Sequence, residues 1–195
     1  MKTTRKITLF SKTLFFALIL FAGQIYSQEF SLNNASSQLT VFGTSNVHDW
    51  DVKAEKQSGK LILDLTGKPQ ITQLKVSIVA ESLKSGKGGM DKNTYKALNT
   101  DKHKNISFEL KEVKSISEAG SGTYKVSTMG DLTIAGVTKR TALDFTMEVT
   151  SNRAVLKGKK KFKMTEYGVT PPKALLGTIT TGDELTIEFN TVLNK

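Results

Sequence analysis

The chain has no cysteine and only two histidines among its 195 residues. Without cysteine it cannot form a disulfide bond, a thiolate metal site or the lipidated cysteine that anchors a bacterial lipoprotein. His48 and His103 do not fall in a standard ligand spacing with the nearby carboxylates, so we predict no metal. No serine lies in a nucleophile elbow or in a recognisable pairing with a histidine. We therefore predict no catalytic residues and no required cofactor.

Long apolar runs are also absent except for "LFFALILFA", residues 14–22, which follows Lys2, Arg5, Lys6 and Lys12. This run is about half of the ~20 residues that a membrane-spanning helix needs. A basic segment, a short apolar run and small residues after it are typical of a signal peptide. We predict a leader over residues 1–27, cleaved after Ser27, and a periplasmic or secreted domain over residues 28–195.

The excess of positive charge is moderate once the leader is removed. The leader carries four of the 28 Lys and Arg residues and no acidic residue, so the remaining 24 basic and 18 acidic residues give a net charge of +6. The lysines are not interleaved with exposed aromatic residues, as nucleic-acid binding would require. We expect no nucleic-acid partner, but we expect weak attraction to anionic membrane surfaces. The sequence does not distinguish a monomer from a homodimer.

Apolar and polar residues alternate with a period of two through most of the chain, which is typical of strands with one buried face. The gaps between these segments are short and rich in Gly, Asn and Asp, so neighbouring strands should be antiparallel. Eight or nine strands of this kind predict an all-β barrel or sandwich, with the first two segments treated as separate strands or as one bent strand. The segments are 38–44, 49–55, 60–66, 71–82, 105–113, 123–134, 141–149, 154–164 and 184–193.

One segment, residues 85–104, breaks this rhythm. Met90, Thr94, Ala97 and Leu98 fall at helical spacing, which predicts a short helix at about 90–99. Such a helix either caps an open end of the barrel or packs outside it, where it shields a sheet edge.

Several motifs in order resemble the YceI-like family of exported bacterial proteins. They are "GTSNVHDW", "ESLKSGKGGMDKNTYKAL" leading to "KNISFEL", "GDLTIAGVTKRTALDF", and "FKMTEYG" before "GDELTIEF". The chain has "HDW" near the first strand instead of the more widespread "HS" of the family. The resemblance implies an antiparallel, lipocalin-like barrel of about eight strands that holds a polyisoprenoid, a quinone or another lipid.

The alternation indicates which side chains point into such a barrel. We predict a ligand-binding lining of apolar residues, although the same residues could simply fill the core. An apolar lining suits an alkyl or isoprenoid chain, because each methylene that leaves water contributes ~0.8 kcal/mol. The predicted lining is Trp50, Leu74, Val76, Ile78, Phe108, Leu110, Leu143, Phe145, Met147, Leu185, Ile187 and Phe189.

Three polar residues are candidates for the mouth of the barrel and a ligand headgroup. Lys160, in the run "KGKKKFKM", is on the same strand face as Leu156 and Phe162, where it could meet an anionic headgroup or extend to water. His48 and Asp49 precede Trp50, and with Asn46 they predict a hydrogen-bonded corner between strands. Trp50 would then turn inward, to stack on a ligand or to seal the core.

The sequence is compatible with three functions. The chain is a carrier or sequestrant of a long apolar ligand, a hydrolase or isomerase acting on such a lipid, or a stress-protection or interaction module with a filled core. A hollow apolar interior favours the carrier, buried polar residues at the end of a cavity favour the enzyme, and a solid interior favours the module.

Overall fold

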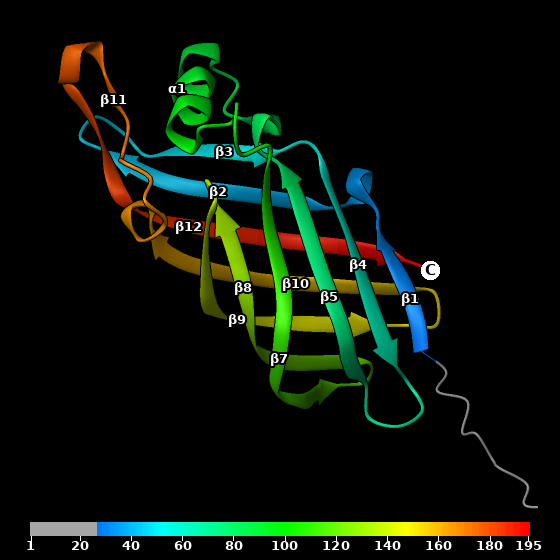
Figure 1. The fold of residues 1–195 in the computed structure, drawn as a ribbon. Helices are drawn as coiled ribbons and strands as arrows, with labels where there is room; N and C mark the ends of the chain where they lie inside the picture. The colour runs from blue at the N-terminus through cyan, green and yellow to red at the C-terminus, as the bar shows by residue number, and fades with distance from the viewer. Residues whose placement is uncertain (1–26) are drawn as a thin grey trace, which may run out of the picture.

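The computed structural model describes residues 27–195 (Figure 1). The predicted signal peptide therefore lies outside the described residues, apart from Ser27, where the first strand β1 (Ser27–Leu32) begins. Among the helices of residues 27–195, none combines the length and the hydrophobicity that a bilayer-spanning segment needs.

Eight antiparallel strands form a closed barrel, which confirms the predicted fold class. Each strand pairs with the next around the barrel, and β12 returns to β1 through the pairs Ser31–Asn194 and Leu32–Leu193. Closure removes the unpaired backbone groups of the sheet edges. The eight strands are β1, β4 (Gln57–Asp64), β5 (Gln70–Val79), β7 (Asn105–Gly120), β8 (Thr123–Ile134), β9 (Val137–Val149), β10 (Arg153–Lys163) and β12 (Ile179–Asn194).

The barrel wall is extended at one end by three further strands, β2 (Gln38–Ser45), β3 (Trp50–Ala54) and β6 (Leu83–Lys84). Strand β12 is long enough to pair with β1 at its C-terminal end and with β2 over residues 181–190. The 3₁₀ turn η1 (Asn34–Ser36) separates β1 from β2.

The interpretation of segments 38–44 and 49–55 as one bent strand is wrong, because β2 and β3 are two strands of a hairpin. Gly43 pairs with Trp50, and the chain reverses between them. The backbone N–H and the hydroxyl of Ser45 both donate to the carbonyl of His48, at 3.1 and 2.7 Å. These bonds close the turn, so the polar residues that precede Trp50 make a reversal rather than a bend.

Helix α1 (Gly88–Leu98) confirms the helix predicted at about 90–99, and it lies across one end of the barrel (Figure 1). It ends where Asn99 adopts a left-handed φ of 50°, a conformation that asparagine tolerates. The short elements η2 (Ala80–Ser82) and β6 connect β5 to the helix.

A second segment borders the same end of the barrel between β10 and β12. It contains the 3₁₀ turns η3 (Met164–Tyr167) and η4 (Leu175–Gly177) and the two-residue strand β11 (Lys173–Ala174), which pairs with the start of β12. Figure 1 shows this segment and α1 standing above the same end of the barrel.

The interior of the barrel away from α1 is filled with packed side chains. Phe30, Leu61, Leu63, Met147 and Leu193 are fully buried there. They belong to one large cluster of packed side chains contributed by all the barrel strands. A second, smaller cluster lies against β2, β3 and α1. The largest space described below lies at the end of the barrel beneath α1, above this packed cluster.

Candidate ligand cavity

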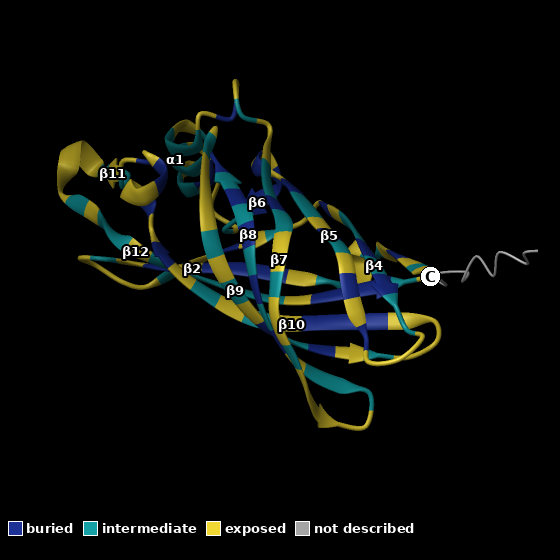
Figure 2. Cartoon of the chain, turned by 60° about the horizontal axis from the view of Figure 1, so that its bottom comes forward, coloured by how far each residue is buried: buried dark blue, intermediate teal, exposed yellow. Residues whose placement is uncertain are grey.

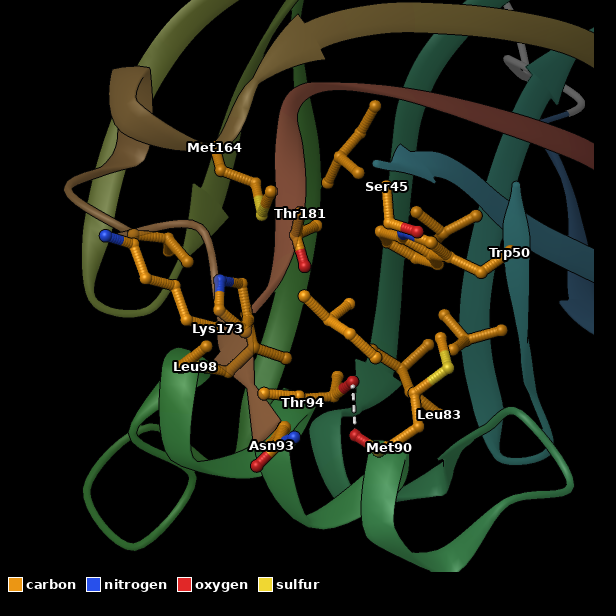
Figure 3. A pocket seen from close by; sticks show the side chains of 18 of the residues that line it. Ser45, Trp50, Leu83, Met90, Asn93, Thr94, Leu98, Met164, Lys173 and Thr181 are labelled. Atoms are coloured by element: carbon orange, nitrogen blue, oxygen red, sulfur yellow. Dashed lines mark hydrogen bonds between the residues drawn. The ribbon is translucent and has the colours of Figure 1, made fainter. Parts of the chain in front are cut away.

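A cavity of about 750 Å³ occupies the barrel end between α1, the β2–β3 hairpin and the segment before β12 (Figure 3). Its walls are mainly apolar, and its size falls within the range of roughly 300–1,000 Å³ typical of small-molecule sites. The lining side chains include Leu39, Val41, Trp50, Val52, Ile78, Leu83, Met90, Ala97, Leu98, Ile106, Ile134, Phe162, Met164, Tyr167, Val169, Ile179, Leu185 and Ile187.

The cavity ends at the same level on several strands. On β5, β7 and β8 the last lining residues are Ile78, Ile106 and Ile134. The next residues on the inner face, Val76, Phe108 and Leu132, belong to the packed cluster. The floor is thus a layer of core side chains two residues further from the mouth, as the period of a strand requires.

The structure divides the predicted lining into two groups. Four of the predicted residues border the cavity: Trp50, Ile78, Leu185 and Ile187. The other eight pack in the filled part of the barrel or beside it: Leu74, Val76, Phe108, Leu110, Leu143, Phe145, Met147 and Phe189. Alternation identifies the inner face of a strand but not the depth at which the core ends. Contact of any of these residues with a ligand stays a prediction.

The three predicted headgroup residues are not together. His48 borders the cavity, and its Nδ1 lies 2.8 Å from the carbonyl oxygen of Asp49. The Asp49 side chain is exposed in the β2–β3 turn and does not border the cavity. Lys160 is half-buried, pairs with Ile187 on β12 and does not border the cavity either.

The strand-to-strand corner is held by the polar residues of the turn. Asn46 donates its side-chain N–H to the carbonyl of Thr178, at 2.9 Å, and accepts the N–H of Thr180, at 2.9 Å. These two bonds join the β2–β3 turn to the start of β12. The two segments therefore form one continuous stretch of the cavity rim.

Trp50 has a fixed place in the cavity wall. Its indole N–H donates to the carbonyl of Thr44, at 2.9 Å. The ring lies against Gly43 on the paired strand, so closely that a Cβ at Gly43 would come 2.1 Å from Trp50 Cζ2. Glycine at position 43 is thus required for the indole to occupy this place.

Helix α1 is anchored as a fixed wall of the cavity. The Asp91 carboxylate is 9% exposed and accepts hydrogen bonds from the hydroxyl and the N–H of Ser85, at 2.6 and 2.8 Å. The hydroxyl bond, supported by the N–H bond and the nearby Lys84 charge, holds the pKa of Asp91 below its usual range. At the middle of the helix, the Tyr95 hydroxyl lies 2.8 Å from the carbonyl oxygen of Glu81.

Few polar groups face the cavity. Its only charged side chains, among the described residues, are Lys87 and Lys173, both near the mouth. Tyr167 is 2% exposed and borders the cavity. Burial, with the negative charge of Glu166 as the second cause, raises the pKa of the Tyr167 hydroxyl. This phenol stays protonated at neutral pH and can donate to a ligand oxygen.

The part of the lining contributed by α1 and residues 172–177 could not be predicted from the sequence. The helical spacing of Met90, Thr94, Ala97 and Leu98 is visible in the sequence, but it does not indicate whether the helix covers the barrel mouth or its outside. For residues 172–177, the signal in the sequence is the group of apolar residues in "PPKALLG", residues 171–177. Among the described residues, no three His, Asp or Glu side chains gather in a group that could hold a metal.

The fold and the cavity define a class: an eight-stranded antiparallel barrel, filled at one end and hollow and apolar at the other. The sequence model of the YceI-like domain family matches residues 30–193, so the chain belongs to the YceI-like family. A search of curated proteins finds no match.

The solved structures with a similar fold include proteins from Burkholderia cenocepacia, Saccharophagus degradans and Campylobacter jejuni. BcnA of Burkholderia cenocepacia is 16% identical, with a TM-score of 0.63, over 83% of this chain and 98% of that one. A polyisoprenoid binding domain from Saccharophagus degradans is 12% identical, with a TM-score of 0.67, over 85% and 97%. The Campylobacter jejuni YceI protein is 17% identical, with a TM-score of 0.56, over 72% and 82%.

Proposed function

We propose that the chain binds the apolar tail of one amphiphilic lipid in the barrel cavity and carries, stores or sequesters it. The observation that carries this proposal is the cavity of about 750 Å³, apolar on its walls and closed below by the packed core. Empty apolar space in a protein interior gives up dispersion contacts and hydrophobic stabilisation. A hydrocarbon chain that fills it recovers both.

The ligand class follows from the polar groups at the cavity. The two charged side chains are lysines, so a neutral or anionic headgroup suits the mouth better than a cationic one. Tyr167 adds one hydroxyl for a headgroup or carbonyl oxygen. A polyisoprenoid, a quinone or a fatty-acyl lipid has this chemistry. The similar domain from Saccharophagus degradans is described as polyisoprenoid binding, which supports the first of these.

The proposed setting is the periplasm or the exterior of the cell. It rests on the predicted leader over residues 1–27 and on the family resemblance. An apolar lipid needs a protein to cross an aqueous compartment, and a cavity that shields its chain provides this.

The two other functions have less support. An enzyme would need a polar pair in the cavity, and of the candidates His48 and Asp49 only His48 borders it. An interaction module with a filled core would have no such hollow. We therefore retain lipid binding without catalysis as the function that the geometry supports best.

Native mass spectrometry of the protein purified from its own cells tests the proposal. We expect one lipid per chain, released by organic extraction, and a processed N-terminus at Gln28. Trp50 is the only tryptophan and borders the cavity, so its fluorescence should change as an emptied protein takes up a quinone or a fatty acid. A protein that is isolated empty and takes up neither would contradict lipid binding.

A further inference from the structure

The hairpin between β11 and β12 presents two leucines to solvent at the rim of the cavity. Leu176 is fully exposed and Leu175 is 70% exposed, and both also border the cavity. Exposed leucines are common as single residues, but two at one turn beside an apolar opening form a patch that lacks a partner in the described chain. Figure 2 shows the segment around β11 as an exposed projection of the barrel end.

The backbone of this turn is unfavourable for leucine. Leu175 and Leu176 have φ values of 47° and 54°, in the left-handed region that Gly and Asn adopt readily. Little of either side chain is buried, so packing within the folded chain does not compensate for the strain. The leucines at this turn therefore indicate a role outside the folded chain itself.

The turn is held firmly, so the leucines are presented in a fixed position. The Thr178 hydroxyl donates to the carbonyl of Leu175, at 2.8 Å, and Asn46 binds the strand beyond it. Val47, at the adjoining β2–β3 turn, is 61% exposed and extends the apolar surface. We call Val47, Leu175 and Leu176 the apolar tip.

Exposed lysines lie on the elements at the same end of the barrel as the apolar tip. The exposed charged residues of α1 and its N-cap are Lys87, Lys92 and Lys96, whereas the acidic Asp91 is buried against Ser85. No acidic residue occurs between Glu166 and Asp183, where Lys173 is the only charge. Asp49 in the neighbouring turn, and Glu81 and Asp101 on either side of α1, are exposed acidic residues of the same region. Apolar side chains with exposed lysines at the same end of the barrel match a bilayer with anionic headgroups.

We propose that the barrel docks mouth-down on an anionic lipid bilayer, with the apolar tip inserted and the lysines on the headgroups. Because Leu175 and Leu176 line the cavity as well as the exterior, a lipid chain can pass from the bilayer into the barrel along apolar surface. The purpose of this docking rests on the proposed function, lipid binding. Membrane docking and lipid binding are nevertheless measured by separate experiments.

Vesicle sedimentation tests the docking. The processed protein is mixed with vesicles of phosphatidylcholine alone or of equimolar phosphatidylcholine and phosphatidylglycerol. We expect binding to the anionic vesicles that weakens at high salt. The double variant Leu175→Asn/Leu176→Gly should reduce this binding by at least about tenfold, because two leucine side chains no longer enter the bilayer.

The same variant controls for its own folding. Asn and Gly fit positive φ better than leucine, so its melting temperature should equal or exceed that of the parent protein. Phe42→Ser removes an apolar side chain of 39% exposure from the barrel wall instead, and should leave vesicle binding unchanged. Lys92→Gln/Lys96→Gln, at positions that do not border the cavity, should weaken binding by about fivefold per lysine.

Three results would overturn the docking: equal binding of the leucine variant and the parent protein, an equal loss in Phe42→Ser, or no preference for anionic vesicles. Uptake of a quinone added without vesicles, followed by Trp50 fluorescence, separates the two proposals. Uptake without vesicle binding refutes docking and leaves lipid binding standing. Vesicle binding without uptake refutes lipid binding and leaves docking standing.

Discussion

The indole of Trp50 lies directly against Gly43, its partner on the neighbouring strand. A Cβ at Gly43 would come 2.1 Å from Trp50 Cζ2, far inside van der Waals contact. A side chain at Gly43 would overlap the indole, which borders the cavity, so Trp50 would have to move. The only tryptophan of the chain thus borders the proposed binding site.

Gly43→Ala should therefore displace Trp50 and narrow the cavity. We expect a loss of about 1–3 kcal/mol in the free energy of unfolding, as for other overpacked sites. Lipid affinity should fall, and the tryptophan emission of the ligand-free protein should shift. Gly67→Ala is the matched control, since no atom lies within 4 Å of a Cβ there. Unchanged emission and affinity would contradict the wall position of Trp50.

Ala97→Phe should block the cavity from the α1 side. Ala97 borders the cavity, so a phenyl ring at this position occupies space that the ligand would fill. We expect affinity to fall at least about tenfold while the unfolding free energy changes by less than about 1 kcal/mol, because the ring enters existing space. Isothermal titration calorimetry with a quinone measures the affinity. Lys96→Ala, an exposed change on the same helix, is the control, and equal affinity of Ala97→Phe would place the ligand elsewhere.

Asp91→Asn should loosen α1. The carboxylate accepts two bonds from Ser85, and we expect a loss of about 1.5–3 kcal/mol in unfolding free energy at pH 7. The lowered pKa of Asp91 means that its contribution is complete above the unfolded value of roughly pH 4 and is lost as pH falls through the lower folded value.

Denaturant unfolding at pH 7 and at pH 3 checks the effect of Asp91. Stability of the parent protein should fall toward acid pH, and that of Asp91→Asn should fall less. Asp101→Asn, at an exposed aspartate, should behave as the parent protein does. An identical acid response in Asp91→Asn would show that the Ser85 bonds do not stabilise the charged form.

Tyr167→Phe should weaken the binding of a ligand with a headgroup oxygen by roughly five- to tenfold, the effect of about one hydrogen bond. Stability should change little, since phenylalanine keeps the buried ring and removes only the hydroxyl. A hydrocarbon of the same chain length is the control ligand, and its affinity should not change. Equal affinities of the parent protein and Tyr167→Phe for the oxygen-bearing ligand would exclude this contact.

The cavity lysines and Lys160 can be separated by substitution. Lys87→Met and Lys173→Met should each reduce retention of an acidic amphiphile by about fivefold, because both lysines border the cavity. Lys160→Met should leave retention unchanged, because Lys160 does not border the cavity. Retention measured by mass spectrometry decides the matter, and a loss in Lys160→Met would support the headgroup role predicted for that residue from the sequence.

Most of the barrel could be predicted from the sequence alone. Alternation of apolar and polar residues identified nearly every barrel strand, because a strand with one buried face must repeat every two residues. The spacing of Met90, Thr94, Ala97 and Leu98 located α1, because a helix with one buried face repeats about every 3.6 residues. Of the eight barrel strands, only β1 was not predicted; it begins at Ser27, the residue at which the predicted leader ends. The two-residue strands β6 and β11 outside the barrel were not predicted either.

The sequence determined which residues face inward, since strand periodicity is a local property of the chain. Only the tertiary structure decided that Ile78, Ile106 and Ile134 border a cavity while Val76, Phe108 and Leu132 fill a core. Apolar side chains look alike in either place, and the difference depends on what lies opposite them across the barrel. The positions of α1 and of Leu175 and Leu176 at the cavity mouth likewise result from contacts between distant segments. No local sequence pattern indicates such contacts.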